Sequence, residues 1–294
     1  MAGAGSLAGG VFPALVTPLD ADRALDTAAL ERLIEHVYRA GCHGLYLCGT
    51  TGEGVLLPAA TRRRIVEIAV RNNPGGRRAI VHVGAWSVEE SVELARHAER
   101  EGAAAVSCLR PHGTSFEEML ELYRGLAGST ALPFLAYHFP EQAGGPLSIG
   151  QLEQVCALPG VAGLKFTDYD LYSLSLLVRQ GKVVFLGRDE VLAAGLLMGA
   201  SGGIGSTYNL APEWFVELYR HACAGSWGEA RAVQDRINDL VRLLLSMPHL
   251  PALKRALAWR GLPCGDALPP RVPLTEAQER ALLSALDGLP GLRS

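Results

Sequence analysis

Short apolar runs alternate along most of this chain with longer segments in which apolar residues recur every three or four positions. An apolar run bounded by turn residues is typical of a buried strand, and the longer period is typical of an amphipathic helix. The pattern predicts eight strands: Val11–Val16, Gly44–Cys48, Ala79–Val83, Ala104–Cys108, Pro133–Tyr137, Val161–Phe166, Val183–Leu186 and Gly202–Ser206.

The segments between these strands have helical periodicity. The clearest is the range 27–40, in which Leu30, Leu33, Ile34 and Val37 fall on one face. The ranges 88–101 and 116–126 follow the same pattern. N-caps are expected at Asp26 or Thr27, at Ser87 and at Ser115.

Eight strand–helix units in succession predict an α/β fold, a (β/α)₈ TIM barrel, over residues 1–225. A doubly wound open sheet is the structural alternative, but no G-x-G-x-x-G sequence follows the first strand. Residues 226–294 contain helical patterns without strands between them, at Ser226–Met247, Pro251–Arg260 and Thr275–Leu286. We therefore expect a C-terminal helical extension packed on the barrel.

Composition narrows the classes of partner. The formal net charge is −3 and no basic stripe is visible, so nucleic acid and anionic membranes are not expected partners. No apolar stretch is long enough to cross a membrane, and the first residues do not have a secretory pattern. The six cysteines form no C-x-x-C pair and the eight histidines have no metal-ligand spacing. These features predict a cytoplasmic protein with reduced thiols and no metal.

Lysine is rare here: only three of the 27 basic residues are Lys. Lys182 follows a turn glycine and Lys254 adjoins Arg255 on a polar helix face, so both have ordinary surface explanations. Lys165 instead lies inside the apolar run 161–166. Burial favours a neutral amine, which can attack a ketone and form a Schiff base, whereas a lysine at a strand end can also extend its charged head to water.

Strand ends carry the other candidate groups, and the active sites of TIM barrels lie at the carboxyl ends of the strands. Strand alternation places Lys165 and Tyr137 on inward faces of neighbouring strands and turns His138 away. The turn after the second strand, Gly-Thr-Thr-Gly, offers the Thr50 and Thr51 hydroxyls and consecutive backbone N–H groups to an anion. A tight turn with a helix N-cap is its alternative explanation.

Taken together, five ordered segments resemble the N-acetylneuraminate lyase/dihydrodipicolinate synthase family of class I, pyruvate-dependent aldolases. They are Gly49–Glu53, His82–Ala85, Tyr137–Pro140, Gly163–Thr167 and Gly203–Asn209. The resemblance implies that Lys165 forms an imine with a 2-keto acid, that Tyr137 relays protons, and that Thr50 and Thr51 hold the carboxylate. It implies no cofactor beyond that covalent imine, and a homotetramer.

Within the family, the lyase branch is the better match. The synthases carry an arginine where this chain has Gln142, and the lyase pattern for binding polyol hydroxyls matches Thr167, Gly187, Asp189, Glu190 and Ser206. The resemblance thus implies cleavage of N-acetylneuraminate, or sialic acid, to pyruvate and N-acetylmannosamine.

Two departures leave a runner-up open. Arg188 stands where the lyases have an uncharged residue, and Ala143 replaces a hydroxyl residue. A pyruvate aldolase or dehydratase acting on a shorter 2-keto-3-deoxy sugar acid is therefore the alternative. For Arg188 we favour pairing with the adjacent Asp189 and Glu190 over contact with substrate. A non-catalytic binding barrel is the hypothesis from another class, and the retained Lys165 argues against it.

Overall fold

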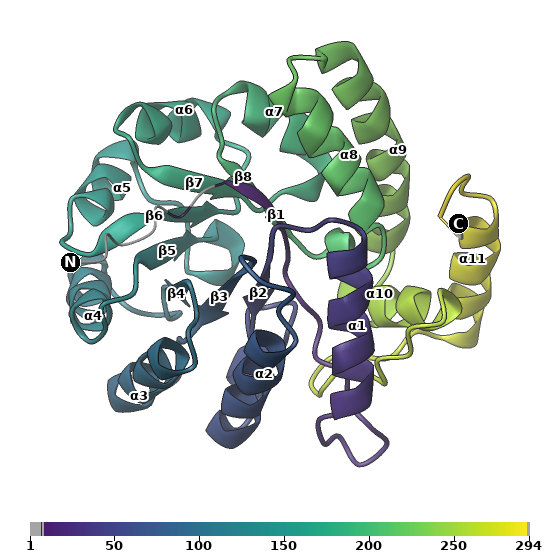
Figure 1. The fold of residues 1–294 in the computed structure, drawn as a ribbon, viewed down its shortest axis with the longest axis horizontal. Helices are drawn as coiled ribbons and strands as arrows, with labels where there is room; N and C mark the ends of the chain where they lie inside the picture. Colours follow the sequence, from purple (N-terminus) through teal and green to yellow (C-terminus); the bar gives the residue numbers. More distant parts are fainter. Residues whose placement is uncertain (1–6, 8, 293–294) are drawn as a thin grey trace.

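The computed structural model describes residue 7 and residues 9–292, and it has the predicted barrel architecture (Figure 1). All eight strands form one parallel sheet in the order β1-β8-β7-β6-β5-β4-β3-β2. They are β1 (Gly10–Pro13), β2 (Gly44–Leu47), β3 (Arg78–His82), β4 (Ala105–Leu109), β5 (Phe134–His138), β6 (Val161–Phe166), β7 (Val183–Leu186) and β8 (Gly202–Gly205).

The seam between β1 and β2 nearly closes this sheet into a barrel. A parallel bridge pairs Ala14 with Tyr46, and Leu15 N donates to Tyr46 O at 2.9 Å. Val16 N then donates to the side chain of Asn209 (3.1 Å) instead of to a strand. This side-chain acceptor explains why β1 ends before Val16, where the apolar run predicts it to continue.

Helices surround the strands, as Figure 1 shows, and an α-helix follows each strand along the chain. They are α1 (Thr27–Arg39), α2 (Ala59–Arg71), α3 (Val88–Arg100), α4 (Phe116–Gly128), α5 (Ile149–Cys156), α6 (Leu171–Arg179), α7 (Leu192–Leu197) and α8 (Pro212–Cys223). The side chains of Asp26, Ser87 and Ser115 accept from backbone N–H groups in the first turns of α1, α3 and α4, which confirms the expected caps.

Two layers of buried side chains hold the barrel together. The outer layer lies between strands and helices and includes Leu164 and Phe166 of β6. Because successive strand residues point to opposite faces, Lys165 of the same strand points into the barrel. The inner layer comprises Leu7, Phe12, Ala14, Tyr46, Ile80, Ala105, Leu135, Tyr137, Phe185 and Ile204.

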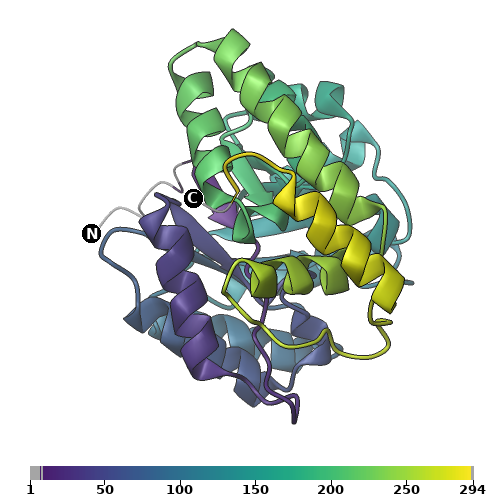
Figure 2. The same cartoon turned by 90° about the vertical axis from the view of Figure 1, so that its right-hand side faces the viewer.

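The C-terminal extension consists of α9 (Trp227–Leu245), α10 (His249–Trp259) and α11 (Glu276–Asp287), which gather on one side of the barrel (Figures 1 and 2). The three expected helices are therefore confirmed. Helix α9 packs along α8, and α10 and α11 pack on each other and on α9. The division of the chain at residues 225 and 226 stays a prediction, because side chains from both parts belong to one outer core.

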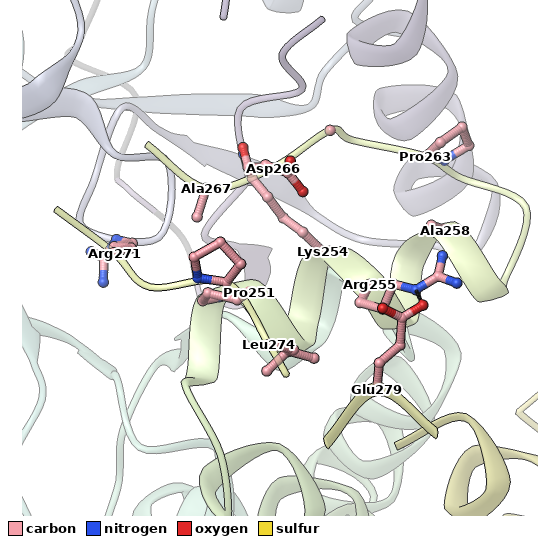
Figure 3. Close-up of a pocket in the computed structure, with 12 residues that line it drawn as sticks. Pro251, Lys254, Arg255, Ala258, Pro263, Asp266, Ala267, Arg271, Leu274 and Glu279 are labelled. Carbon is pink, nitrogen blue, oxygen red and sulfur yellow. Dashed lines mark hydrogen bonds and ion pairs between the residues drawn. The ribbon is translucent and has the colours of Figure 1, made fainter. Parts of the chain in front are cut away.

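The segment 261–274 connects α10 to α11, and we call it the C-terminal strap. Figure 3 shows this region, with Lys254 of α10 reaching toward the strap near Asp266 and with Arg255 next to Glu279 of α11. Arg255 Nε donates to Glu279 Oε1 at 2.6 Å, which joins the two helices.

Lys254 is not the surface residue that its polar neighbour predicts. It is 2% exposed, its ammonium lies 3.0 Å from Glu53 Oε2, and it donates to Asp266 O at 2.8 Å. Glu53 also accepts from Leu268 N of the strap at 2.6 Å. The surface interpretation was wrong because the counter-charge comes from the turn after β2, far away in the sequence.

Candidate active site

Lys165 of β6 lies at the centre of the barrel's carboxyl end. Its side chain is 4% exposed, and its Nζ is 4.0 Å from the centroid of the Tyr46 ring and 4.1 Å from that of Tyr137. Burial lowers the pKa of Lys165 to about 7, and the negative charge of Asp189 opposes that shift. A large share of the amine is therefore neutral, and nucleophilic, near neutral pH.

Tyr137 of β5 is the register partner of Lys165. Its ring stacks on Phe139 with centroids 5.9 Å apart and meets the Tyr46 ring edge-on at 6.1 Å. Burial raises the pKa of Tyr137 to about 12, and the Thr50 hydroxyl opposes this shift. The phenol therefore keeps its proton at neutral pH and can donate it to a neighbouring oxygen.

The turn Gly49–Glu53 follows β2 and faces the lysine across the cavity. The backbone is in the left-handed region at Cys48 (φ 56°), just before the turn, and at Glu53 (φ 55°), a conformation that non-glycine residues adopt rarely. Thr17 Oγ1 donates to Gly52 O at 2.6 Å and holds the turn from the β1 side. Thr50 and Thr51 both line the cavity, where their hydroxyls can bind a carboxylate.

Asp189 begins η3 (Asp189–Val191) after β7 and is 4% exposed. Its Oδ2 accepts from Thr207 N at 2.8 Å, while its Oδ1 has no hydrogen-bond partner within the described part of the chain. Burial raises the pKa of Asp189 to about 6. The carboxylate is thus fixed by one oxygen, and the other remains as an acceptor.

Two glycines permit this arrangement because neighbouring side chains approach them closely. A Cβ at Gly187 would lie 1.9 Å from Thr167 Oγ1, and a Cβ at Gly205 would lie 1.9 Å from Asp189 Oδ1. Any side chain at either position would displace a polar group of the site. Gly187 therefore acts by making room for Thr167.

The outer part of the cavity is formed by loops after β7 and β8 and by the C-terminal extension. Glu190 accepts a hydrogen bond from the phenol of Tyr169, and Ser206 Oγ lies 3.0 Å from His249 Nε2. The cavity volume is about 440 Å³, within the usual range of about 300–1,000 Å³ for small-molecule sites. It can hold a substrate of sugar-acid size.

The structure brings all the predicted site residues to this one cavity. They are Thr50, Thr51, Tyr137, Lys165, Thr167, Gly187, Asp189, Glu190 and Ser206. His138 instead pairs with Asp168 Oδ2 (3.2 Å) and stacks near Phe166, in agreement with the strand alternation.

Sequence reasoning missed the contribution of the extension. His249, Arg271 and Val272 line the cavity together with Lys165. No local pattern marks His249, which is the first residue of a helix, or Arg271, which lies in the strap. Their positions depend on how the extension folds over the barrel.

Arg188 does not pair with its sequence neighbours. It pairs with Glu141 of η2 (Pro140–Gln142) and lies over the rings of Tyr169 (4.4 Å) and Phe139 (5.5 Å). Of the expected partners, Glu190 accepts from Tyr169 and Asp189 Oδ2 accepts from Thr207 N, while Asp189 Oδ1 has no hydrogen-bond partner among the described residues. The expected pairing was therefore wrong, and Arg188 lines the mouth of the cavity.

Among residue 7 and residues 9–292, no group of three or more His, Cys, Asp or Glu side chains is arranged to hold a metal ion. None of the helices formed by these residues is both long and apolar enough to span a membrane. The residues that converge on the cavity are instead an amine, a phenol, hydroxyls and carboxylates.

Comparison with known proteins places this site in a family. The Dihydrodipicolinate synthetase family matches residues 7–288. N-acetylneuraminate lyase of Escherichia coli is 38% identical over 255 residues, which are 85% of this chain and 86% of that protein. Proteus mirabilis N-acetylneuraminate lyase superposes with a TM-score of 0.88 at 28% identity, covering 96% of this chain and 98% of the other.

A prophage protein of the dihydrodipicolinic acid synthase family from E. coli K12, solved in complex with pyruvate, superposes with a TM-score of 0.90 at 26% identity. The overlap covers 96% of this chain and 99% of that one. The fold and these relatives define an enzyme, a lyase of the class I aldolase type with a TIM barrel. The chain belongs to the dihydrodipicolinate synthetase family.

Proposed function

We propose that this enzyme cleaves N-acetylneuraminate to pyruvate and N-acetylmannosamine through an imine on Lys165. The observation that carries the proposal is the buried amine of Lys165, whose pKa is lowered to about 7, beside the Tyr137 ring. The substrate is supported by the Escherichia coli relative, which is named N-acetylneuraminate lyase and is 38% identical.

The chemistry balances without a metal or an added cofactor. The Lys165 amine adds to the C2 ketone of the open-chain sugar acid, and loss of water gives a protonated imine. Removal of the proton from the C4 hydroxyl breaks the C3–C4 bond, the aldehyde leaves, and the electron pair moves to the imine nitrogen to form an enamine. Protonation at C3 and addition of water then release pyruvate and restore the amine.

Tyr137 is the proposed relay for the C4 hydroxyl proton. Its phenol is protonated at neutral pH, so it accepts that proton only as it passes its own to a neighbouring oxygen. The hydroxyls of Thr50 and Thr167 both interact with this phenol, and the Thr50 hydroxyl, which has the larger effect on its pKa, is our candidate for that exchange.

Substrate binding divides between the two sides of the cavity. The Thr50 and Thr51 side is proposed to bind the keto-acid carboxylate. Thr167, Asp189, Glu190 and Ser206 are proposed to bind the hydroxyls of the polyol chain, and Gly187 leaves room for Thr167. Several acceptors facing one region suit a substrate with many hydroxyl donors.

A second candidate, supported by Arg188, is a shorter 2-keto-3-deoxy sugar acid, cleaved or dehydrated. The guanidinium lines the cavity and forms an ion pair with Glu141, whose side chain is largely exposed, so a long substrate that reached this pair would have to fit beside it. A substrate that ends before this pair would leave the pair intact.

The test is release of pyruvate from N-acetylneuraminate and from shorter 2-keto-3-deoxy sugar acids, with native protein and Arg188→Val. We expect N-acetylneuraminate to have the highest kcat/KM with native protein. No cleavage of N-acetylneuraminate by either protein, together with turnover of a shorter acid, would transfer the assignment to the second candidate.

We also propose a homotetramer that works in carbohydrate breakdown in the cytoplasm. Exposed apolar side chains support an interface next to the site: Trp86 is 94% exposed, Val55 52% and Leu56 43%, and all three line a groove of about 500 Å³ that also includes Thr50. The six cysteines are free thiols, as in a reducing compartment. A stable monomer in light scattering at micromolar concentration would contradict the tetramer.

A further inference from the structure

His249 reaches the active site from outside the barrel. It is the first residue of α10 in the C-terminal extension, yet it lines the same cavity as Lys165 and Tyr137. Its Nε2 lies 3.0 Å from Ser206 Oγ, the hydroxyl at the end of β8. The extension thus contributes a polar side chain that contacts a residue proposed to bind the substrate.

The surroundings of His249 favour its neutral imidazole. Burial lowers the pKa of His249, the positive charge of Arg271 acts in the same direction, and the charge of Glu190 opposes them. In a neutral imidazole one nitrogen carries a hydrogen and donates, while the other nitrogen accepts. The direction of the bond to Ser206 therefore depends on which nitrogen carries that hydrogen.

The surroundings of Nδ1 decide the direction. This atom is buried and has no hydrogen-bond partner in the described ranges 7 and 9–292. A hydrogen on Nδ1 would be a buried unpaired N–H donor, and such donors are rarer and more costly than unpaired acceptors. The hydrogen therefore belongs on Nε2, which donates to Ser206 Oγ.

The direction of the hydrogen bond between His249 and Ser206 determines whether the Ser206 hydroxyl can still donate to a group in the cavity. A serine oxygen that accepts from His249 still has its own O–H to donate. Asp189 Oδ1 and the Glu190 carboxylate, on the neighbouring loop, can only accept when they are ionised. The outer cavity then holds acceptors on one loop and one oriented donor on the next.

We propose that His249 is a positioning residue that holds the Ser206 hydroxyl as a hydrogen-bond donor to an oxygen on the half of the substrate that leaves as the aldehyde. The proposal rests on the proposed function for the nature of that half, a polyol chain. It adds a selection rule: at the position of Ser206 the substrate must present an acceptor oxygen. The pyruvate half, on the Thr50 side, is independent of His249.

The test is a double-mutant cycle with His249→Leu, Ser206→Ala and the combined variant, with His249→Gln as the conservative control. The glutamine amide nitrogen can occupy the place of Nε2 and donate to Ser206. His249→Leu should raise KM for the sugar acid roughly five- to tenfold, the effect of one neutral hydrogen bond, with a smaller change in kcat. His249→Gln should stay within about threefold of the native KM.

Two further results complete the prediction. The combined variant should lose no more than Ser206→Ala alone, because His249 acts through that hydroxyl. The rate at which pyruvate and cyanoborohydride modify Lys165 should be unchanged in all variants, which shows that they fold and keep the pyruvate half-site.

Additive losses, a KM unchanged in His249→Leu, or no recovery in His249→Gln would overturn the proposal. A slower pyruvate adduct in His249→Leu would also overturn it, because His249 would then support the whole site. If N-acetylneuraminate is not cleaved by native protein, the proposed function fails on its own. The same cycle on the sugar acid that is cleaved then still decides the role of His249.

Discussion

Two lysines of this chain are buried, and their surroundings differ. Lys165 is 4% exposed and Lys254 is 2% exposed. Lys254 faces the Glu53 carboxylate at 3.0 Å and donates to a backbone carbonyl. The ammonium of Lys165 lies over two aromatic rings, at 4.0 and 4.1 Å from their centroids.

Burial alone therefore does not make a nucleophile. The two amines differ in their partners, because Lys254 forms a buried ion pair with Glu53. At Lys165 no carboxylate forms an ion pair with the amine among the described residues, the charge of Asp189 opposes the effect of burial only partly, and the pKa falls to about 7. One lysine ties the extension to the turn after β2, and the other is available for covalent chemistry.

The largest expected effect is the loss of turnover when Lys165, the proposed nucleophile, is replaced. Lys165→Met should lower turnover by on the order of 10⁴–10⁶-fold, because no imine can form and the electron pair has no sink. Lys182→Met is the matched control, since Lys182 donates to Val161 O away from the cavity and should keep near-native turnover. Pyruvate release under saturating substrate measures both. Substantial turnover by Lys165→Met would refute the covalent route.

The next largest effect is expected when the phenol hydroxyl of Tyr137, beside Lys165, is removed. Tyr137→Phe keeps the ring over the amine, so the imine should still form with pyruvate. Cleavage should fall about 10²–10⁴-fold, the usual contribution of a positioned acid–base group. Single-turnover kinetics separate the two steps, and cleavage at the native rate would show that the phenol only packs.

For Lys254 the expected loss is in stability. Lys254→Met leaves the buried Glu53 carboxylate without its nearest counter-charge, which should reduce the free energy of unfolding by about 3–5 kcal/mol. Glu53→Gln combined with Lys254→Met should recover part of this loss, because no fully buried charge is left unpaired and the glutamine oxygen can still accept from Leu268 N. Urea unfolding of both variants, with Lys182→Met as control, measures the difference. Equal stability of all variants would show that the pair contributes nothing.

A smaller effect is expected from pH, because the rate of imine formation depends on the lowered pKa of Lys165. Only the neutral amine attacks, and the pKa of Lys165 is about 7. The initial rate of adduct formation should therefore rise about tenfold per pH unit below 7 and level off above it. A rate that keeps rising to about pH 10 would mean that Lys165 titrates as an ordinary lysine.

The sequence predicts the barrel and the inward face of β6 because both follow from local alternation of apolar residues. Lys165 and Tyr137 meet because their strands are neighbours in register, which chain order and strand parity suffice to anticipate. The strand β1 ends at Pro13, before the predicted Val16, because the Asn209 side chain competes for the N–H of Val16.

The remaining features depend on contacts between distant segments. The sequence around Lys254 predicts a surface residue, because its partner Glu53 is distant along the chain. Likewise, no local pattern around His249 indicates its contact with Ser206. Arg188 pairs with Glu141, which follows β5 and is far away in the sequence, and not with the adjacent Asp189 and Glu190. Contacts between segments that are distant along the chain decide these cases, and a single sequence does not encode them locally.

The most direct test of the account is to incubate the native enzyme with pyruvate and borohydride and to map the modified peptide by mass spectrometry. We expect one reduced pyruvate adduct per chain, on Lys165, with Lys254 and Lys182 unmodified. The same treatment of Lys165→Met should give no adduct. An adduct on Lys254 or Lys182 with Lys165 untouched would contradict the claim that the unpaired buried lysine is the nucleophile.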